Sequence, residues 1–165
     1  MITIEINDLV VEDIIRTVCP SVTEQVSGIS LKSSDSKPVA GIDNPISVVV
    51  MSRGNFMSKA VMTLPFEFVS KIVDGMSKGS ELSSEDREAY FREYVNIFFG
   101  RFISAINRKT GRPSRFVIPV VLKGKYQETA ESAYKNRVEV SFEADDGDMQ
   151  ITMRYDVLPD YGGVE

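Results

Sequence analysis

The chain has 165 residues, of which 42% are hydrophobic and 26% are charged, and these proportions are typical of globular proteins. This length favours a single domain over residues 1–165, large enough to bury a core without disulfides or metals. A formal net charge of −5 argues against nucleic-acid binding, because proteins that bind the phosphate backbone concentrate lysine and arginine. The absence of histidine excludes Ser-His-Asp and Cys-His catalytic sites and zinc sites built on histidine.

The apolar runs of the sequence are short, and its single cysteine lies within one of them. None of these runs approaches the roughly 20 residues that cross a bilayer, and the N-terminal sequence has no basic leader. We therefore expect a cytoplasmic protein without membrane contact. Cys19 has apolar neighbours and is predicted to lie in the core as a free thiol. We expect this chain to bind no cofactor and no metal of its own.

The first forty residues are predicted to alternate between extended and helical structure. Isoleucines at every second position predict a short strand or extended arm over residues 2–6. Asp8 is then predicted to cap a helix that ends near Pro20, because proline removes a backbone donor. Residues 23–32 are predicted as a strand and residues 33–38 as a polar loop.

The next segment predicts a hairpin followed by a helix. Residues 46–53 and 56–64 both alternate between apolar and polar side chains, and a Gly-Asn pair separates them. Pro65 is suited to the start of a helix, and the apolar residues of 66–76 recur at helical spacing.

The longest periodic segment predicts a helix over about residues 84–109, with acids near its start and bases near its end. Residues 115–123 read as a strand, in which Pro119 indicates an edge position or a bulge. A polar connection over residues 124–136 leaves room for a short helical turn.

The last third predicts a second hairpin, formed by residues 137–144 and 148–158 around an acidic turn, with residues 157–165 frayed. The element order therefore indicates an α+β fold. We expect an antiparallel or mixed sheet of about six strands, including two hairpins, covered by helices.

The predicted long helix has two distinct faces. At 100° per residue, its apolar side chains fall within an arc of about 140° and predict a buried face. They are Phe91, Val95, Phe98, Phe99, Phe102, Ile103 and Ile106. A polar stripe about 80° wide lies opposite and is predicted to face outward. It contains Glu93, Asn96, Gly100, Ser104 and Asn107.

Glu93 and Asn96 are three residues apart, so their side chains are neighbours on the helix surface. The segment EYVNIFFGR, residues 93–101, resembles the E-x-x-N-x-x-x-G-[KR] signature of the CheX, CheC and FliY phosphatases. The order of predicted elements also resembles that of this family. The sequence contains one copy of the signature, which resembles CheX, since CheC usually carries two. Val95 stands directly before Asn96, where the family commonly has glycine.

The resemblance implies hydrolysis of the aspartyl phosphate on a CheY-type response regulator. The partner would supply both the phosphorylated aspartate and the Mg²⁺ ion. The resemblance further implies that Asn96 holds the attacking water, while Glu93, ionised when exposed, pairs with a lysine of the regulator. Family members often form dimers, so a homodimer is also implied.

Two other functions stay open at the level of sequence. The chain could be a CheX-like module that docks on a receiver domain without hydrolysing anything, and Val95 favours this alternative. It could also be a structural domain that associates with itself through the edges of its strands.

Overall fold

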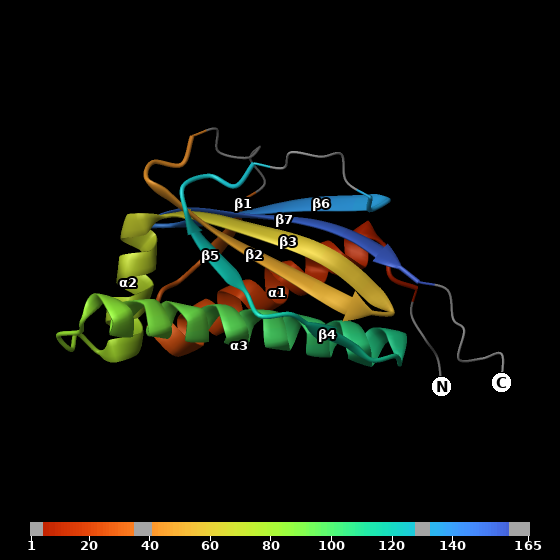
Figure 1. The fold of residues 1–165 in the computed structure, drawn as a ribbon, viewed down its shortest axis with the longest axis horizontal. Coiled ribbons are helices and arrows are strands. Elements are labelled where there is room, and N and C mark those ends of the chain that lie inside the picture. The colour runs from red at the N-terminus through yellow and green to blue at the C-terminus, as the bar shows by residue number, and fades with distance from the viewer. Residues whose placement is uncertain (1–4, 35–40, 128–132, 159–165) are drawn as a thin grey trace.

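The computed structural model describes residues 5–34, 41–127 and 133–158 of the chain. Within them, seven strands form one antiparallel sheet, and three helices lie against it (Figure 1). The strands are β1 (Lys32–Ser34), β2 (Pro45–Gly54), β3 (Phe56–Pro65), β4 (Ser114–Phe116), β5 (Val120–Lys123), β6 (Asn136–Ala144) and β7 (Gly147–Val157). The helices are α1 (Asp8–Ser27), α2 (Phe66–Ser77) and α3 (Ser84–Thr110). None of these helices combines the length and apolarity that crossing a membrane requires.

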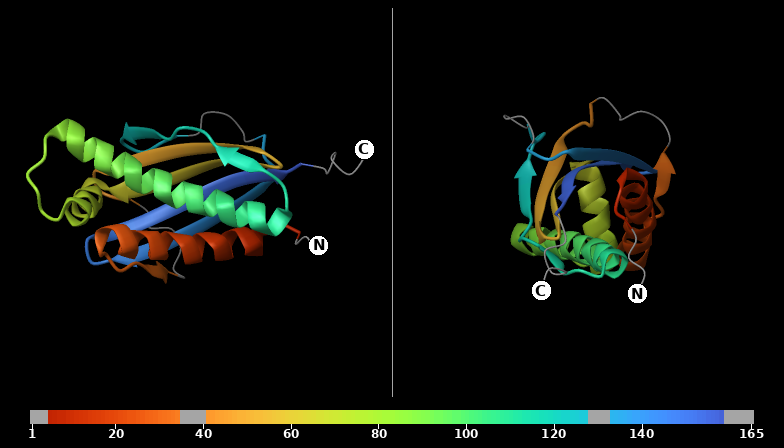
Figure 2. Two further views of the ribbon diagram at one scale, coloured as in Figure 1. Left: turned by 90° about the horizontal axis from the view of Figure 1, so that it is seen from below. Right: turned by 90° about the vertical axis from the view of Figure 1, so that its right-hand side faces the viewer.

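The sheet has the strand order β1-β6-β7-β3-β2-β4, and β5 also pairs with β2. Helices α1 and α3 run next to each other along one face of the sheet, and α2 stands at one end (Figures 1 and 2). This arrangement confirms the predicted α+β class. The sheet has seven strands instead of about six, because β1 is present and residues 115–123 divide into β4 and β5.

The core lies between the sheet and the helices. Alternate residues of β3 are buried, as expected for a strand with one face against the core. The ring of Phe56 on β3 lies 5.9 Å from that of Phe102 on α3 and 5.2 Å from that of Tyr155 on β7, so aromatic contacts join helix and sheet. Cys19 is fully buried, as predicted, and this burial raises the pKa of its thiol to about 12.

Helix α1 is longer than the sequence predicted. It continues through Pro20 to Ser27, and Asn7 caps its start with a 3.0 Å bond from the Val10 amide. The predicted stop at Pro20 and the predicted strand over residues 23–32 are therefore wrong. Apolar burial continues past Pro20, where Val22 is fully buried, and this burial offsets the lost backbone bond.

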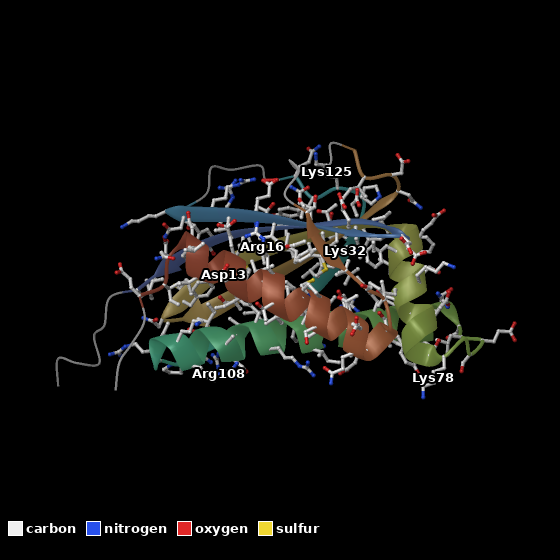
Figure 3. All side chains as sticks on the ribbon, turned by 180° about the vertical axis from the view of Figure 1, so that it is seen from behind. Asp13, Arg16, Lys32, Lys78, Arg108 and Lys125 are labelled. Carbon is white, nitrogen blue, oxygen red and sulfur yellow. The ribbon has the colours of Figure 1, made fainter. Side chains whose placement is uncertain are left out.

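The outer side of α1 is charged. Figure 3 shows Asp13 and Arg16 on the helix as seen from behind the molecule, and Asp13 is exposed. Arg16 pairs with Glu12 at 3.4 Å, one turn earlier. This helix therefore buries one side against the core and leaves the other side in solvent.

The edge of the sheet beside α3 contains a bulge, as Pro119 indicated. Phe116 of β4 pairs with Ser52, and Val120 of β5 pairs with Val49. The chain from β4 to β5 therefore has one residue more than the stretch of β2 that it faces, which defines a bulge. Pro119 lies within the bulge, where its missing N–H removes no ladder bond.

Both predicted hairpins are confirmed, as are α2 and the extent of α3. The predicted fraying does not begin at residue 157, because Val157 ends β7 and the Leu158 amide donates to Asn55 O at 2.8 Å. The described parts of the 124–136 connection contain no helical turn. The predictions for residues 2–4, 35–38, 128–132 and 159–165 lie outside the described residues.

Helix α2 approaches the end of α1 closely at Gly75. A Cβ atom on Gly75 would lie 2.1 Å from the carbonyl oxygen of Ser27, closer than any real contact. The glycine is therefore required by packing between the two backbones.

We predict that Gly75→Ala lowers the free energy of unfolding by about 2–3 kcal/mol, because the helices must separate to admit the methyl group. Urea unfolding followed by circular dichroism measures the change. Gly100→Ala on α3 is the matched control, since a Cβ there meets only a Phe116 ring carbon at 3.7 Å. This control should be neutral or up to about 1 kcal/mol more stable. Equal effects of both substitutions would contradict the prediction.

Candidate functional site

Helix α3 carries both candidate residues and is capped at each end. The Ser83 side chain accepts a bond from the Asp86 amide at 3.1 Å, and Gly111 ends the helix in a left-handed conformation with φ of 68°. Glu85 and Asp86 lie in the first turn, and two bases lie in the last, where they suit the helix dipole. These features explain a helix of 27 residues with a defined start and end.

The rotation of α3 about its axis is fixed from two sides. The predicted apolar face is buried against the sheet and α1. Tyr94, which the sequence analysis did not place on this face, is also fully buried, and its hydroxyl lies 2.7 Å from that of Thr23 on α1. Burial raises the pKa of Tyr94 well above its ordinary value, so its hydroxyl stays protonated. The Thr23 hydroxyl donates to Cys19 O at 2.7 Å, which leaves its oxygen to accept from Tyr94.

Glu93 and Asn96 lie on the solvent side of α3, as predicted. Both side chains are exposed, and neither has a hydrogen bond or an ion pair within the part of the chain that the structure describes. Their neighbour Arg92, by contrast, is engaged with Glu88 at 3.3 Å and with Pro119 O at 3.4 Å. A carboxylate and a carboxamide on one rigid surface are therefore free to contact an incoming molecule.

The rest of the predicted stripe divides into two parts. Ser104 is exposed, as predicted, whereas Gly100 and Asn107 are half-buried because β4 passes over them. The Asn107 side chain accepts from the Ser114 amide at 2.9 Å and donates to Ser114 O at 3.0 Å. The outward prediction is thus wrong for Asn107, which fastens β4 to α3.

Val95, the departure from the family signature, lies away from this surface. Its side chain is fully buried in the core, on the opposite side of the helix from Glu93. The valine therefore adds no bulk between Glu93 and Asn96.

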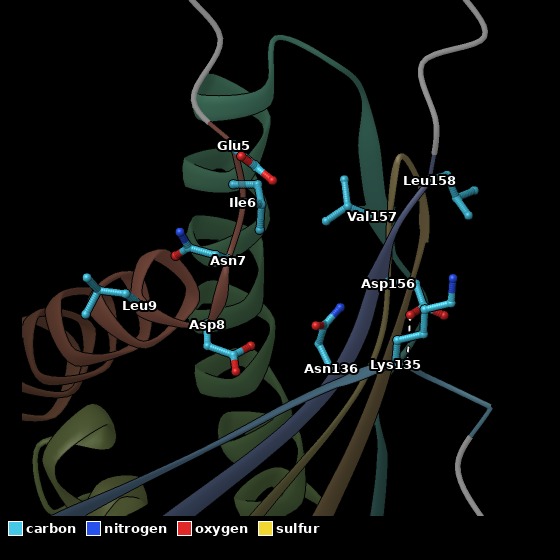
Figure 4. Close-up of a pocket in the computed structure, with 10 residues that line it drawn as sticks. All are labelled: Glu5, Ile6, Asn7, Asp8, Leu9, Lys135, Asn136, Asp156, Val157 and Leu158. Atoms are coloured by element: carbon cyan, nitrogen blue, oxygen red, sulfur yellow. Dashed lines mark hydrogen bonds between the residues drawn. The ribbon is translucent and has the colours of Figure 1, made fainter.

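A pocket elsewhere in the molecule does not involve α3. It has a volume of about 640 Å³ and opens between the start of α1, at Asn7 and Asp8, and residues Lys135 and Asp156 (Figure 4). The Lys135 amide donates to Asp156 at 2.7 Å within it. The part of the chain with assigned structure holds no group of three or more acidic or thiol side chains positioned for a metal. We assign the site to the exposed surface of α3 and not to this pocket.

A family model covers this helix. The model for "Chemotaxis phosphatase CheX" matches residues 46–143, which include α3 and most of the sheet. The chain belongs to the CheX family. No match was found among curated protein sequences.

Solved structures of CheX proteins share the fold at low sequence identity. The chemotaxis protein CheX from Desulfovibrio desulfuricans has a TM-score of 0.72 and 15% identity, covering 88% of this chain and 99% of its own. CheX from Vibrio vulnificus has a TM-score of 0.71 and 17% identity, covering 92% and 100%. CheX of Borrelia burgdorferi, solved as a CheX–CheY–BeF3–Mg²⁺ complex, has a TM-score of 0.67 and 15% identity, covering 92% and 99%. CheC-like and FliY proteins are also among the structural neighbours.

The buried hydroxyl pair Tyr94–Thr23 generates a prediction about the support of the site. Tyr94→Phe should lower the free energy of unfolding by about 1 kcal/mol, because one buried hydrogen bond between α1 and α3 is lost. Chemical denaturation measures this change. Tyr90→Phe on the same helix removes a hydroxyl from a half-buried tyrosine and should change stability by less than about 0.5 kcal/mol. A Tyr94→Phe protein as stable as the wild type would show that the pair does not fasten the helices.

Proposed function

We propose that this CheX-family protein hydrolyses the aspartyl phosphate of a CheY-type response regulator in chemotaxis or related two-component signalling. The observation that carries the proposal is the exposed and unpartnered pair Glu93 and Asn96 on α3, in a chain of the CheX family. The regulator would dock on this surface, and the reaction would take place in the cytoplasm.

Asn96 is proposed to position the attacking water. Phosphoryl transfer depends on positioning and charge stabilisation more than on covalent help from the enzyme. A carboxamide both donates and accepts hydrogen bonds, so it can orient one water toward phosphorus while contacting the phosphoryl oxygens. Asn96 lies on a helix that is capped and packed, which restricts its movement, and restricted movement is the main requirement for such a role.

The Mg²⁺ ion and the phosphorylated aspartate are proposed to come from the regulator. The Borrelia structure is a complex of its CheX with CheY, BeF3 and Mg²⁺. Glu93 is proposed to pair with a lysine near the phosphorylation site of the regulator and so to orient the docked complex.

We predict that Asn96→Ala lowers kcat about a hundredfold, the typical cost of losing one well-placed polar group in acyl or phosphoryl transfer. The assay mixes the protein with phosphorylated receiver domains from the same organism and follows phosphate release. The side chain is exposed, so the variant should unfold at the same urea concentration as the wild type. Ser104→Ala, on the exposed side of the same helix, is the matched control and should retain full activity. Equal rates for wild type and Asn96→Ala would end the catalytic assignment.

We predict a different effect for Glu93→Gln, which should raise KM about fivefold, corresponding to roughly 1 kcal/mol for an exposed ion pair, with little change in kcat. The difference from wild type should shrink as salt is added, because exposed charges are screened. Glu24→Gln on the exposed side of α1 is the control for a change of one charge. A fall in kcat at constant KM would contradict the orienting role.

The second candidate function is a binding module that docks on a receiver domain without hydrolysis. This alternative was favoured by Val95, which replaces the glycine common in the family. The Val95 side chain is buried and leaves the exposed pair Glu93 and Asn96 unobstructed. Binding of a phosphorylated receiver with no acceleration of phosphate loss would favour the module over the enzyme.

A further inference from the structure

The bulge between β4 and β5 presents an unusually exposed apolar side chain. We refer to residues 117–119 as the bulge segment. Ile118 is 81% exposed, more than any other large hydrophobic residue that the structure describes, and Val117 beside it is 41% exposed. Single exposed apolar residues are common on protein surfaces, so the position and rigidity of this segment decide its meaning.

The backbone of the bulge segment is held at both ends. The Val117 amide donates to Met51 O on β2 at 2.7 Å, and the Arg92 guanidinium on α3 donates to Pro119 O at 3.4 Å. The proline ring further limits the conformations of this backbone. Ile118 therefore projects from a restrained segment, which reduces the entropy lost when a partner covers it.

The bulge segment runs along the ridge of α3 that carries Asn96. On one side of the segment, Phe116 packs against Gly100, whose added Cβ would lie 3.7 Å from the ring. On the other side, Pro119 is bonded to Arg92. Asn96 lies midway between Gly100 and Arg92, one turn from each along the same ridge. Since Phe116 lies beside Gly100 and Pro119 lies beside Arg92, the residues between them, Val117 and Ile118, lie level with Asn96.

We propose that Ile118 and Val117 form an apolar docking wall for the phosphorylated receiver domain, beside the polar pair of α3. This inference rests on the proposed function and adds a determinant of affinity and specificity to it. A receiver whose phosphoryl group comes within hydrogen-bonding distance of Asn96 covers the adjacent bulge segment as well. The continuity of the wall with the Asn96 surface therefore identifies its occupant as the same partner.

The two parts of this surface have different tasks. The polar pair acts on the phosphoryl group, whereas Ile118 buries apolar area against the receiver and keeps bulk water from that side of the site. Loss of the wall should weaken binding of the receiver and leave the reaction of the bound complex nearly intact. This split between KM and kcat distinguishes docking from catalysis.

The test compares Ile118→Lys with Leu9→Lys, which places the same charge at a residue 66% exposed on the first turn of α1. We expect Ile118→Lys to raise KM for the phosphorylated receiver about tenfold or more, with kcat within about twofold of wild type. Its dissociation constant for a beryllofluoride-activated receiver should rise by the same factor. Leu9→Lys should match the wild type, and the conservative Ile118→Leu should retain most of the affinity.

The possible results separate this proposal from the proposed function. Unchanged KM and affinity in Ile118→Lys, while Asn96→Ala loses activity, would overturn the docking wall and leave the phosphatase function standing. A wild type that binds the activated receiver without hydrolysis, with weakened binding in Ile118→Lys, would support the wall and refute catalysis. A change in oligomeric state of Ile118→Lys, measured by light scattering, with unchanged receiver affinity would overturn the proposal in favour of contact between two copies. A wild type that binds no phosphorylated receiver would refute both.

Discussion

The rotational setting of α3 determines which of its side chains reach solvent. Its apolar side is buried against the sheet and α1, Tyr94 is bonded to Thr23 on a second side, and Asn107 fastens β4 along a third. Glu93 and Asn96 lie on the side that is left open to solvent. A rotation of α3 by the angle of one residue would expose apolar groups and, in one direction, carry Asn96 into the core, so packing energy holds the candidate site in position.

This arrangement separates stability from chemistry within a single helix. The residues that face the core, among them Val95 and Tyr94, contribute burial and one internal hydroxyl pair. The two exposed polar residues contribute nothing visible to the described fold, since they have no partner in it. Residues without a structural role are free to be selected for a task outside the molecule. The proposed phosphatase function gives them one.

The periodic elements were predictable from the sequence because each depends on its own local pattern. The hairpins, α2 and α3 all follow from apolar spacing and turn residues, and the same spacing predicted that Glu93 and Asn96 face outward. The errors arose where contacts with other elements override local preference. Pro20 predicts a helix end, yet burial beyond it keeps α1 helical to Ser27. Tyr94 was left out of the predicted buried face and Asn107 was wrongly placed outward, because their partners, Thr23 and Ser114, lie on other elements.

The apolar wall could not be read from the sequence, although Pro119 correctly indicated a bulge. Ile118 occurs in a run that resembles an ordinary strand, and only the pairing of both flanks with β2 reveals the extra residue. Bulges change the direction of a side chain relative to the regular pleat. Here the bulge lies level with Asn96, and the alternation of apolar residues in the sequence cannot indicate that position.

The place of β7 in the sheet has a consequence for how the molecule is made. This strand follows every other described element along the chain, yet it lies between β3 and β6 and pairs with both. On the ribosome, β3 would therefore emerge long before its neighbour and wait with one edge unpaired. The phenylalanine side of α3 would likewise lack its full cover until synthesis reached the final strand. Completion of the sheet should thus wait for synthesis of β7, and until then the partly made chain exposes an unpaired strand edge and apolar surface.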